Sequence, residues 1–101
     1  MSQRPLQNQV AWITGSSRGL GRVMAEELVR LGARVAVHGT RPDSPKTFGE
    51  GESMQQVADQ IAETCDGTTM PVWSDVTNEE EVNRVALEIR EHWGRRWARL
   101  V

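Results

Sequence analysis

Residues 10–31 read VAWITGSSRGLGRVMAEELVRL and join a short apolar run to a glycine-rich turn and a helical pattern. The run at residues 10–13 lacks polar alternation, which favours a strand buried on both faces of a parallel sheet. From Leu20 onward apolar residues recur at helical spacing, so we expect the helix to begin inside the glycine turn. The predicted buried stripe of this helix consists of Leu20, Val23, Met24, Leu28 and Leu31.

The turn between strand and helix predicts an anion site. Its glycines permit positive φ angles and let a ligand approach the backbone. The free N–H groups and the positive dipole end of the following helix point into such a turn, which suits the phosphates of a nucleotide. The alternative is an ordinary strand-to-helix turn with spare glycines. The candidate cofactor-binding residues of the turn are Gly15, Ser16, Ser17, Arg18, Gly19, Leu20 and Gly21.

The glycine spacing points to a dinucleotide. A second, valine-rich strand is predicted at residues 34–38, about twenty residues further on, as the dinucleotide-binding fingerprint requires. The spacing Gly15-x-x-x-Gly19-x-Gly21, preceded by Thr14, is one residue wider in its first gap than the usual Gly-x-Gly-x-x-Gly. This TGxxxGxG pattern resembles the short-chain dehydrogenase/reductase family, in particular its 3-oxoacyl reductases. The resemblance covers essentially the whole chain and implies an α/β fold, the N-terminal half of a Rossmann doubly wound parallel sheet.

Two further helices are predicted downstream. The first begins with a capping box at Ser53 and Gln56 and stops at Gly67, and the second begins with a capping box at residues 77–80 and ends at Gly94. Their predicted buried faces are Met54, Val57, Ala58, Ile61, Ala62 and Cys65 on the first and Val82, Val85, Ala86, Ile89 and Trp93 on the second.

Two further strands complete the predicted domain. Residues 68–73 predict a strand that Pro71 confines to a sheet edge or a strand start. Residues 96–101 form the possible start of a fourth strand beside the first, and residues 39–52 form an unusually long loop. We therefore expect one partial nucleotide-binding domain over residues 1–101, ordered β-α-β-α-β-α with a partial fourth strand.

Arg18 and Arg41 decide the predicted cofactor. NAD sites of this kind place an acidic side chain at the end of the second strand, whereas NADP sites place arginine there for the 2′-phosphate. Residues 38–41 (HGTR) contain no acid. The family resemblance agrees, since a basic residue before the second motif glycine, here Arg18, is associated with NADP. We predict NADP(H), with NAD less favoured; the alternative is that both arginines are solvated surface charges.

Asp75 and Val76 are the candidate adenine contacts. The resemblance implies this role, because an Asp-Val pair at the end of the third strand contacts the adenine ring in similar family members. The alternative is that Asp75 helps to cap the third helix, where a carboxylate is stabilising. Both roles are compatible.

The residues that carry the family's chemistry are not matched. As the resemblance implies, the reaction uses Tyr-x-x-x-Lys, an upstream serine and an asparagine, all beyond the fourth strand. The sequence has no tyrosine, so no residue matches the proton donor that hydride transfer to a carbonyl needs. We expect His38 to be a packed strand-end residue. No catalytic residue is assigned, and we expect the chain alone to be inactive.

Three functions stay open on the sequence alone. The first is the cofactor-binding portion of an NADP-dependent reductase that acts on a carbonyl or alcohol substrate and is cut short before its catalytic half. The second is a nucleotide-binding module without chemistry, and the third is a fragment that forms no competent site.

The composition argues against other classes. A chain of 101 residues leaves room for one small domain, and a net charge of -2 gives no case for nucleic acid or a membrane surface. No apolar run approaches the roughly twenty residues of a membrane span and no signal-peptide core is evident, so we expect a cytoplasmic location. Cys65 is the single cysteine, which excludes an internal disulfide and a thiolate metal site. The resemblance implies that full-length relatives are usually homo-oligomers.

Overall fold

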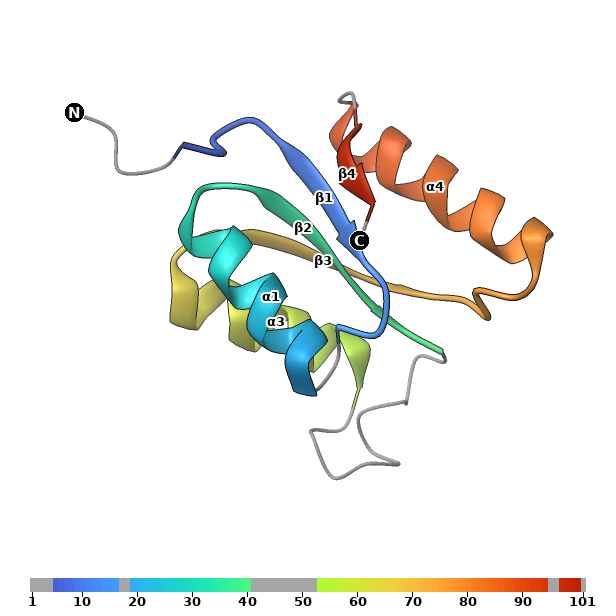
Figure 1. Cartoon of the computed structure of the whole chain (residues 1–101), viewed down its shortest axis with the longest axis horizontal. Coiled ribbons are helices and arrows are strands. Elements are labelled where there is room, and N and C mark those ends of the chain that lie inside the picture. Colours follow the sequence, from blue (N-terminus) through green and yellow to red (C-terminus); the bar gives the residue numbers. More distant parts are fainter. Residues whose placement is uncertain (1–4, 17–18, 41–52, 95–96, 101) are drawn as a thin grey trace.

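A four-stranded parallel sheet in the order β3-β2-β1-β4 organises the computed structural model (Figure 1). The structure describes residues 5–16, 19–40, 53–94 and 97–100. The strands are β1 (Val10–Ile13), β2 (Arg34–Gly39), β3 (Thr68–Trp73) and β4 (Trp97–Leu100). β1 pairs with β2 and β4, and β3 lies at an edge, where its Pro71 is tolerated. The predicted α/β class and strand order are confirmed.

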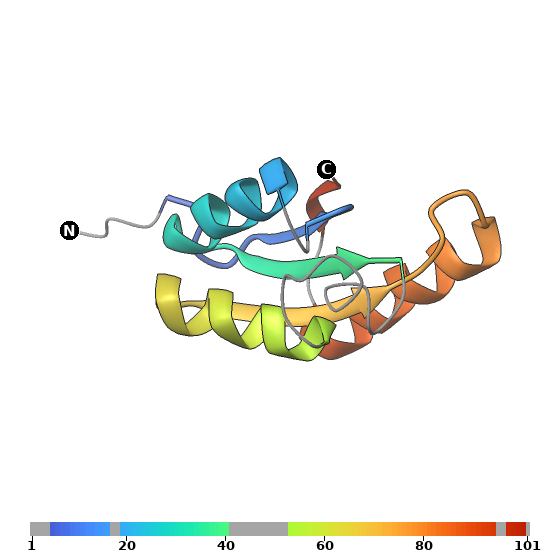
Figure 2. The same ribbon diagram turned by 90° about the horizontal axis from the view of Figure 1, so that it is seen from below.

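Helices pack on both faces of this sheet. α1 (Gly19–Arg30) and α3 (Met54–Cys65) share one core with the sheet, and α4 (Glu79–Trp93) shares the other. Figure 2 shows α1 and α3 alongside the strands, with α4 reaching past the strand ends. Within the described ranges, none of the helices combines the length and hydrophobicity that crossing a membrane requires.

Successive strand residues divide between the two cores, because side chains of a strand point alternately to opposite faces. Ala11, Ile13, Val35 and Val37 pack with α1 and α3, whereas Val10, Trp12 and Ala36 pack with α4. The predicted face of α3 is confirmed at Met54, Val57, Ala58, Ile61 and Cys65, which are buried, whereas Ala62 is half-buried. On α4 Val85 and Ile89 are buried, and Val82, Ala86 and Trp93 pack against their core, as predicted.

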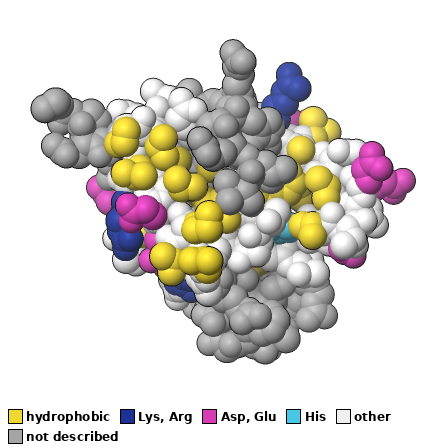
Figure 3. Space-filling view, in the orientation of Figure 1, with side chains coloured by type: hydrophobic (Ala, Val, Ile, Leu, Met, Phe, Trp, Pro, Cys, Tyr) yellow, Lys and Arg dark blue, Asp and Glu magenta, His cyan; other side chains and the backbone are white. Residues whose placement is uncertain are grey.

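The prediction of a buried stripe on α1 was wrong for its first three residues, Leu20, Val23 and Met24. Ala25 and Val29 are completely buried, whereas Leu20 and Val23 are 76% and 60% exposed. Met24 is also exposed. Figure 3 shows hydrophobic side chains on the outer surface over the region of α1.

Size explains why the smaller side chains of α1 face inward. A Cβ at Gly21 would run into the backbone of Gly15, so the helix passes in direct contact with the turn that follows β1. Gly21, Ala25 and Val29 lie four residues apart and form one line along the helix. Only small residues fit where helix and sheet approach so closely. The prediction failed because it considered the hydrophobicity of the residues and not their size.

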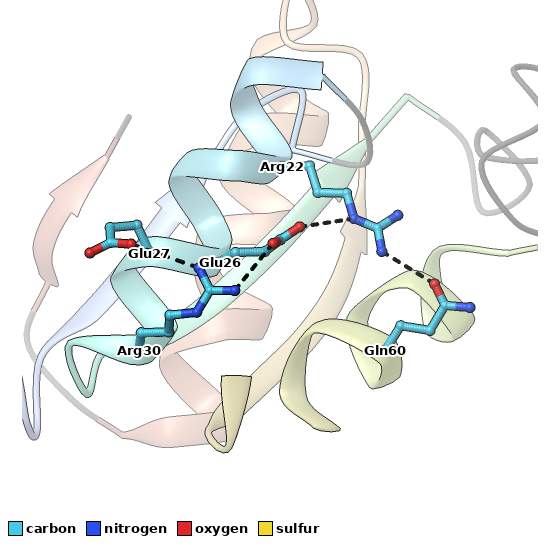
Figure 4. A network of polar contacts seen from close by, with 5 residues as sticks. All are labelled: Arg22, Glu26, Glu27, Arg30 and Gln60. Carbon is cyan, nitrogen blue, oxygen red and sulfur yellow. Dashed lines mark hydrogen bonds and ion pairs between the residues drawn. The ribbon is translucent and has the colours of Figure 1, made fainter. Parts of the chain in front are cut away.

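Polar contacts join the outer sides of α1 and α3 (Figure 4). Arg22 Nε lies 3.3 Å from Glu26 Oε1, and Arg22 also donates to Gln60 of α3. Arg30 lies within 3.7 Å of Glu26 and 3.8 Å of Glu27. Each partly exposed pair of this kind contributes about 0–1 kcal/mol, so the buried side chains dominate the packing of α1.

The ends of α3 follow the predicted signals except at the last turn. The side chain of Ser53 caps the helix by accepting a hydrogen bond from the Gln56 N–H at 3.1 Å, as predicted. At the other end Asp66, not Gly67, adopts the left-handed conformation, with φ of 54°. Gly67 is required for a different reason, because a Cβ there would collide with the Val29 side chain.

The N-cap of α4 lies one residue after Thr77, the N-cap of the predicted capping box. Asn78 is the N-cap, and its side chain accepts from the Glu81 N–H at 3.2 Å. The Glu81 carboxylate in turn accepts from the Asp75 N–H. Gly94 ends the helix in the left-handed conformation, as predicted.

The assignment of the buried face of α1 can be tested with two valines of one helix. We expect Val29→Ala to lower the free energy of unfolding by about 1.5–3 kcal/mol, since it removes buried methyl groups and leaves a cavity. Val23→Ala should change it by less than about 0.5 kcal/mol, because Val23 is exposed. Urea denaturation of both variants provides the measurement. Equal losses would contradict the assignment.

Candidate functional site

The turn between β1 and α1 is shaped by glycines with two different tasks. Gly15 and Gly19 adopt φ angles of 64° and 62°, which L side chains rarely tolerate. A Cβ at either position would meet nothing within 4 Å, so both face open space. Gly21 instead permits the contact between α1 and the Gly15 backbone. The turn is therefore open on its outer side and tightly held on its inner side.

The amino end of α1 adds a positive potential to this open side. The first N–H groups of a helix lack partners within the helix and carry the positive end of its dipole. α1 begins at Gly19, as predicted, and has no acidic residue in its first turn to neutralise that end. An anion is the ligand that this arrangement favours.

Ser16 belongs to the inner side of the turn. Its side chain is completely buried, and its hydroxyl lies 2.7 Å from the Ile13 carbonyl oxygen and 2.8 Å from the His38 amide nitrogen. The Ser16 amide donates to the His38 carbonyl at 2.9 Å. The hydroxyl and the amide N–H of Ser16 are therefore both engaged within the fold.

His38 packs at the carboxyl end of β2, as predicted. It is 2% exposed, and its Nε2 lies 3.0 Å from the Ser74 carbonyl oxygen and 3.1 Å from the Ser74 hydroxyl. Because a carbonyl only accepts, Nε2 carries the proton of the neutral ring. Among the described residues, no group bonds to the buried Nδ1. Burial lowers the pKa of His38 below its ordinary value, and the hydrogen bond to the Ser74 carbonyl offsets part of that effect.

Asp75 begins the turn that leads into α4. Its carboxylate accepts hydrogen bonds from the Thr77 hydroxyl at 2.6 Å and the Thr77 N–H at 2.9 Å. These two bonds, the hydroxyl first, lower the pKa of Asp75. The neighbouring Val76 is 55% exposed. Asp75 thus orders the approach to α4, while the adenine contact stays a prediction.

The structure places the described candidate residues at one edge of the sheet. Carboxyl ends of parallel strands meet at the same edge, so the turn after β1 and the Asp75 turn after β3 both lie there. Ser17, Arg18 and Arg41 lie outside the described residues. The sequence had not singled out Ser74, although a polar residue directly after a predicted strand was the available signal. The described part of the chain holds no group of His, Cys, Asp or Glu side chains able to bind a metal ion.

The strand order and the glycine turn after β1 are those of a Rossmann-type α/β domain. The profile of the family described as short chain dehydrogenase matches residues 9–98. The chain therefore belongs to the short-chain dehydrogenase family.

Two curated relatives illustrate the similarity. The chain is 36% identical over 91 residues to the hydroxynaphthalene reductase-like protein Arp2 of Metarhizium acridum, covering 90% of this chain and 31% of the relative. It is 34% identical over 84 residues to the 3-oxoacyl-(acyl-carrier-protein) reductase FabG of Aquifex aeolicus, covering 83% of this chain and 30% of the relative. The chain thus spans about a third of the length of these relatives.

Solved structures agree with this relationship. A hydroxysteroid dehydrogenase from Escherichia coli superposes with a TM-score of 0.77 at 26% identity, covering 97% of this chain and 37% of that one. A short-chain type dehydrogenase/reductase from Mycobacterium marinum superposes with a TM-score of 0.72 at 31% identity, covering 88% of this chain and 31% of that one.

The buried neutral state of His38 predicts a pH-dependent stability. Well above the ordinary histidine pKa of 6.5 the ring is neutral in both folded and unfolded chains, so it contributes no slope. As pH falls below that value, the unfolded chain gains a proton that the folded chain resists, and the free energy of unfolding decreases by up to about 1.4 kcal/mol per pH unit. Urea denaturation between about pH 7.5 and pH 5.5 measures this slope.

Two histidine variants isolate that contribution. His38→Gln should flatten the decrease, whereas His92→Gln, which changes an exposed histidine of α4, should preserve it. An unchanged slope in His38→Gln would contradict the assignment.

Proposed function

We propose that residues 1–101 form the NADP(H)-binding portion of a short-chain reductase acting on a carbonyl or alcohol substrate. The observation that carries this proposal is the open outer side of the glycine turn, where Gly15 and Gly19 leave the backbone accessible at the amino end of α1. Family membership supports a nicotinamide dinucleotide as the ligand. The net charge of -2 gives no basic excess for a nucleic-acid or membrane partner, and the proposal includes neither. A cytoplasmic location is part of the same proposal.

The described residues fit the phosphates of such a cofactor. Backbone N–H groups at the start of α1 would hold the pyrophosphate, and the missing side chain at Gly19 leaves room for it. The Asp75 turn, at the same edge of the sheet, would receive the adenine ring with Val76. When bound, the cofactor supplies the hydride that family members transfer. This chain's own contribution is to bind and orient it.

The preference for NADP(H) rests on charge at the end of β2. Residues 38–41 contain no acid that would accept the ribose hydroxyls of NAD, whereas Arg41 and Arg18 offer charge-assisted bonds to a 2′-phosphate. Proton transfer is not assigned to this chain, because the sequence has no tyrosine to match the family's proton donor.

Two glycines with the same backbone conformation test the phosphate site. Gly19→Ala and Gly94→Ala each add a methyl group at a positive φ, of 62° and 61°, and each methyl enters open space. Only Gly19 lies in the turn where we place the pyrophosphate. We expect Gly19→Ala to weaken NADPH binding at least tenfold, corresponding to about 1.4 kcal/mol, and Gly94→Ala to leave it within about twofold. Titration with NADPH fluorescence gives both dissociation constants.

Two outcomes of that titration would contradict the proposal. Equal weakening in both variants would show that backbone strain, rather than the phosphate site, controls binding. An absence of NADPH binding by the unmodified chain would remove the proposed function altogether.

A second pair of variants tests cofactor choice. Arg41→Ala should weaken NADPH binding about ten- to a hundredfold and leave NADH nearly unchanged, because only NADPH carries the 2′-phosphate. Arg34→Ala removes the same charge at the opposite end of β2 and should affect neither cofactor. Titrations at fixed salt with both reduced cofactors measure the four affinities. Equal losses for NADPH and NADH in Arg41→Ala would refute the 2′-phosphate assignment.

A further inference from the structure

The buried polar side chains of the described residues are all found at the proposed cofactor edge. They are Ser16, His38 and Ser74, exposed by 0%, 2% and 2%. Burying a polar group is unfavourable unless it is hydrogen-bonded, and an apolar residue would fill the same space more simply. Because all three lie at this edge, we look for a role that these polar side chains have there.

Ser16 joins the chain after β1 to His38, the β2 residue that follows the last pair of the β1–β2 ladder. The ladder ends at Ile13 and Val37, and the chain then turns away through the glycines. The Ser16 hydroxyl accepts from the His38 N–H at 2.8 Å and donates to the Ile13 carbonyl at 2.7 Å. The Ser16 N–H donates to the His38 carbonyl at 2.9 Å. The start of the glycine turn is thereby fixed to β2 by two hydrogen bonds and to the end of β1 by a third.

The same residue of β2 is joined to the turn after β3. His38 Nε2 lies within 3.1 Å of both oxygens of Ser74, and the Ser74 N–H donates to the Gly39 carbonyl at 3.1 Å. Asp75 follows Ser74 directly. A continuous set of buried hydrogen bonds thus runs from the glycine turn through β2 to the Asp75 turn.

We infer that Ser16, His38 and Ser74 are positioning residues that hold the phosphate-binding turn and the adenosine-binding turn at the separation that one dinucleotide requires. This inference rests on the proposed function. The hydroxyls of Ser16 and Ser74 do not contact the cofactor. Each acts by restricting the backbone that does, so that the bound geometry exists before the ligand arrives.

Ser16→Ala is the direct test. It removes the hydroxyl and leaves the Ile13 carbonyl and the His38 N–H without their shared partner. We expect NADPH binding to weaken about tenfold. Val29→Ala is the matched control, because it destabilises the opposite end of α1 and should change the dissociation constant by less than about twofold while the chain stays folded. Urea denaturation of each variant shows whether it is folded under the titration conditions.

If Ser16→Ala fails to fold, a milder variant still tests the inference, and a spectroscopic measurement adds a second readout. Ser74→Ala keeps the carbonyl that His38 contacts and removes one oxygen only, so we expect about threefold weaker NADPH binding. In 1H–15N NMR spectra without cofactor, Ser16→Ala should shift the amide signals of Gly15 and Gly19, whereas Val29→Ala should leave them in place.

The outcomes separate the inference from the proposed function. If the unmodified chain binds NADPH and Ser16→Ala binds it equally well, the inference is overturned and the proposed function stands. If Val29→Ala weakens binding as much as Ser16→Ala, a general loss of stability explains the effect and the inference is again overturned. If Ser16→Ala does not fold, unchanged binding by Ser74→Ala overturns it. If the unmodified chain does not bind NADPH, both are overturned.

Discussion

Gly21 lies so close to the backbone of Gly15 that no side chain fits between α1 and the turn after β1. This contact fixes where the helix begins relative to the strand, and the inward face of α1 follows from it. Ala25 and Val29 continue the line of small residues that starts at Gly21, and the larger Leu20 is left outside. The open side of the turn exists because the helix is held on its inner side. The proposed anion site and the packing of α1 on the sheet therefore both depend on one close approach.

The elements of this fold could be predicted well where hydrophobic periodicity and burial coincide. The run at residues 10–13 and the stripe of α3 both gave the observed element and its buried side. The edge position of β3 agreed with Pro71, which cannot donate to a neighbouring strand, and with the doubly wound strand order. Local chemistry was sufficient in these segments, since no long-range contact competed with it.

The errors arose where a distant contact decided the outcome. The inward face of α1 depends on the Gly15 backbone. The need for glycine at position 67, between α3 and β3, depends on the side chain of Val29 in α1. The N-cap of α4 is Asn78 rather than Thr77, because the Thr77 N–H and hydroxyl are both bonded to the Asp75 carboxylate. Within the candidate site, the glycines could be recognised from spacing, whereas the inward direction of the Ser16 side chain could not. That direction depends on a β2 residue more than twenty positions away, as its bond with His38 shows.

NMR titration of the chain with NADP+ tests most directly whether a dinucleotide binds at the carboxyl edge of the sheet through the glycine turn. We expect saturable shifts of the Gly15 and Gly19 amide signals, with little change at Gly32 and Gly67. The latter two glycines line a hollow at the opposite, amino-terminal edge of the strands, together with Gln7, Asn8, Arg34 and Thr68. Shifts confined to that hollow, or no saturable shift at either edge, would contradict dinucleotide binding at the glycine turn.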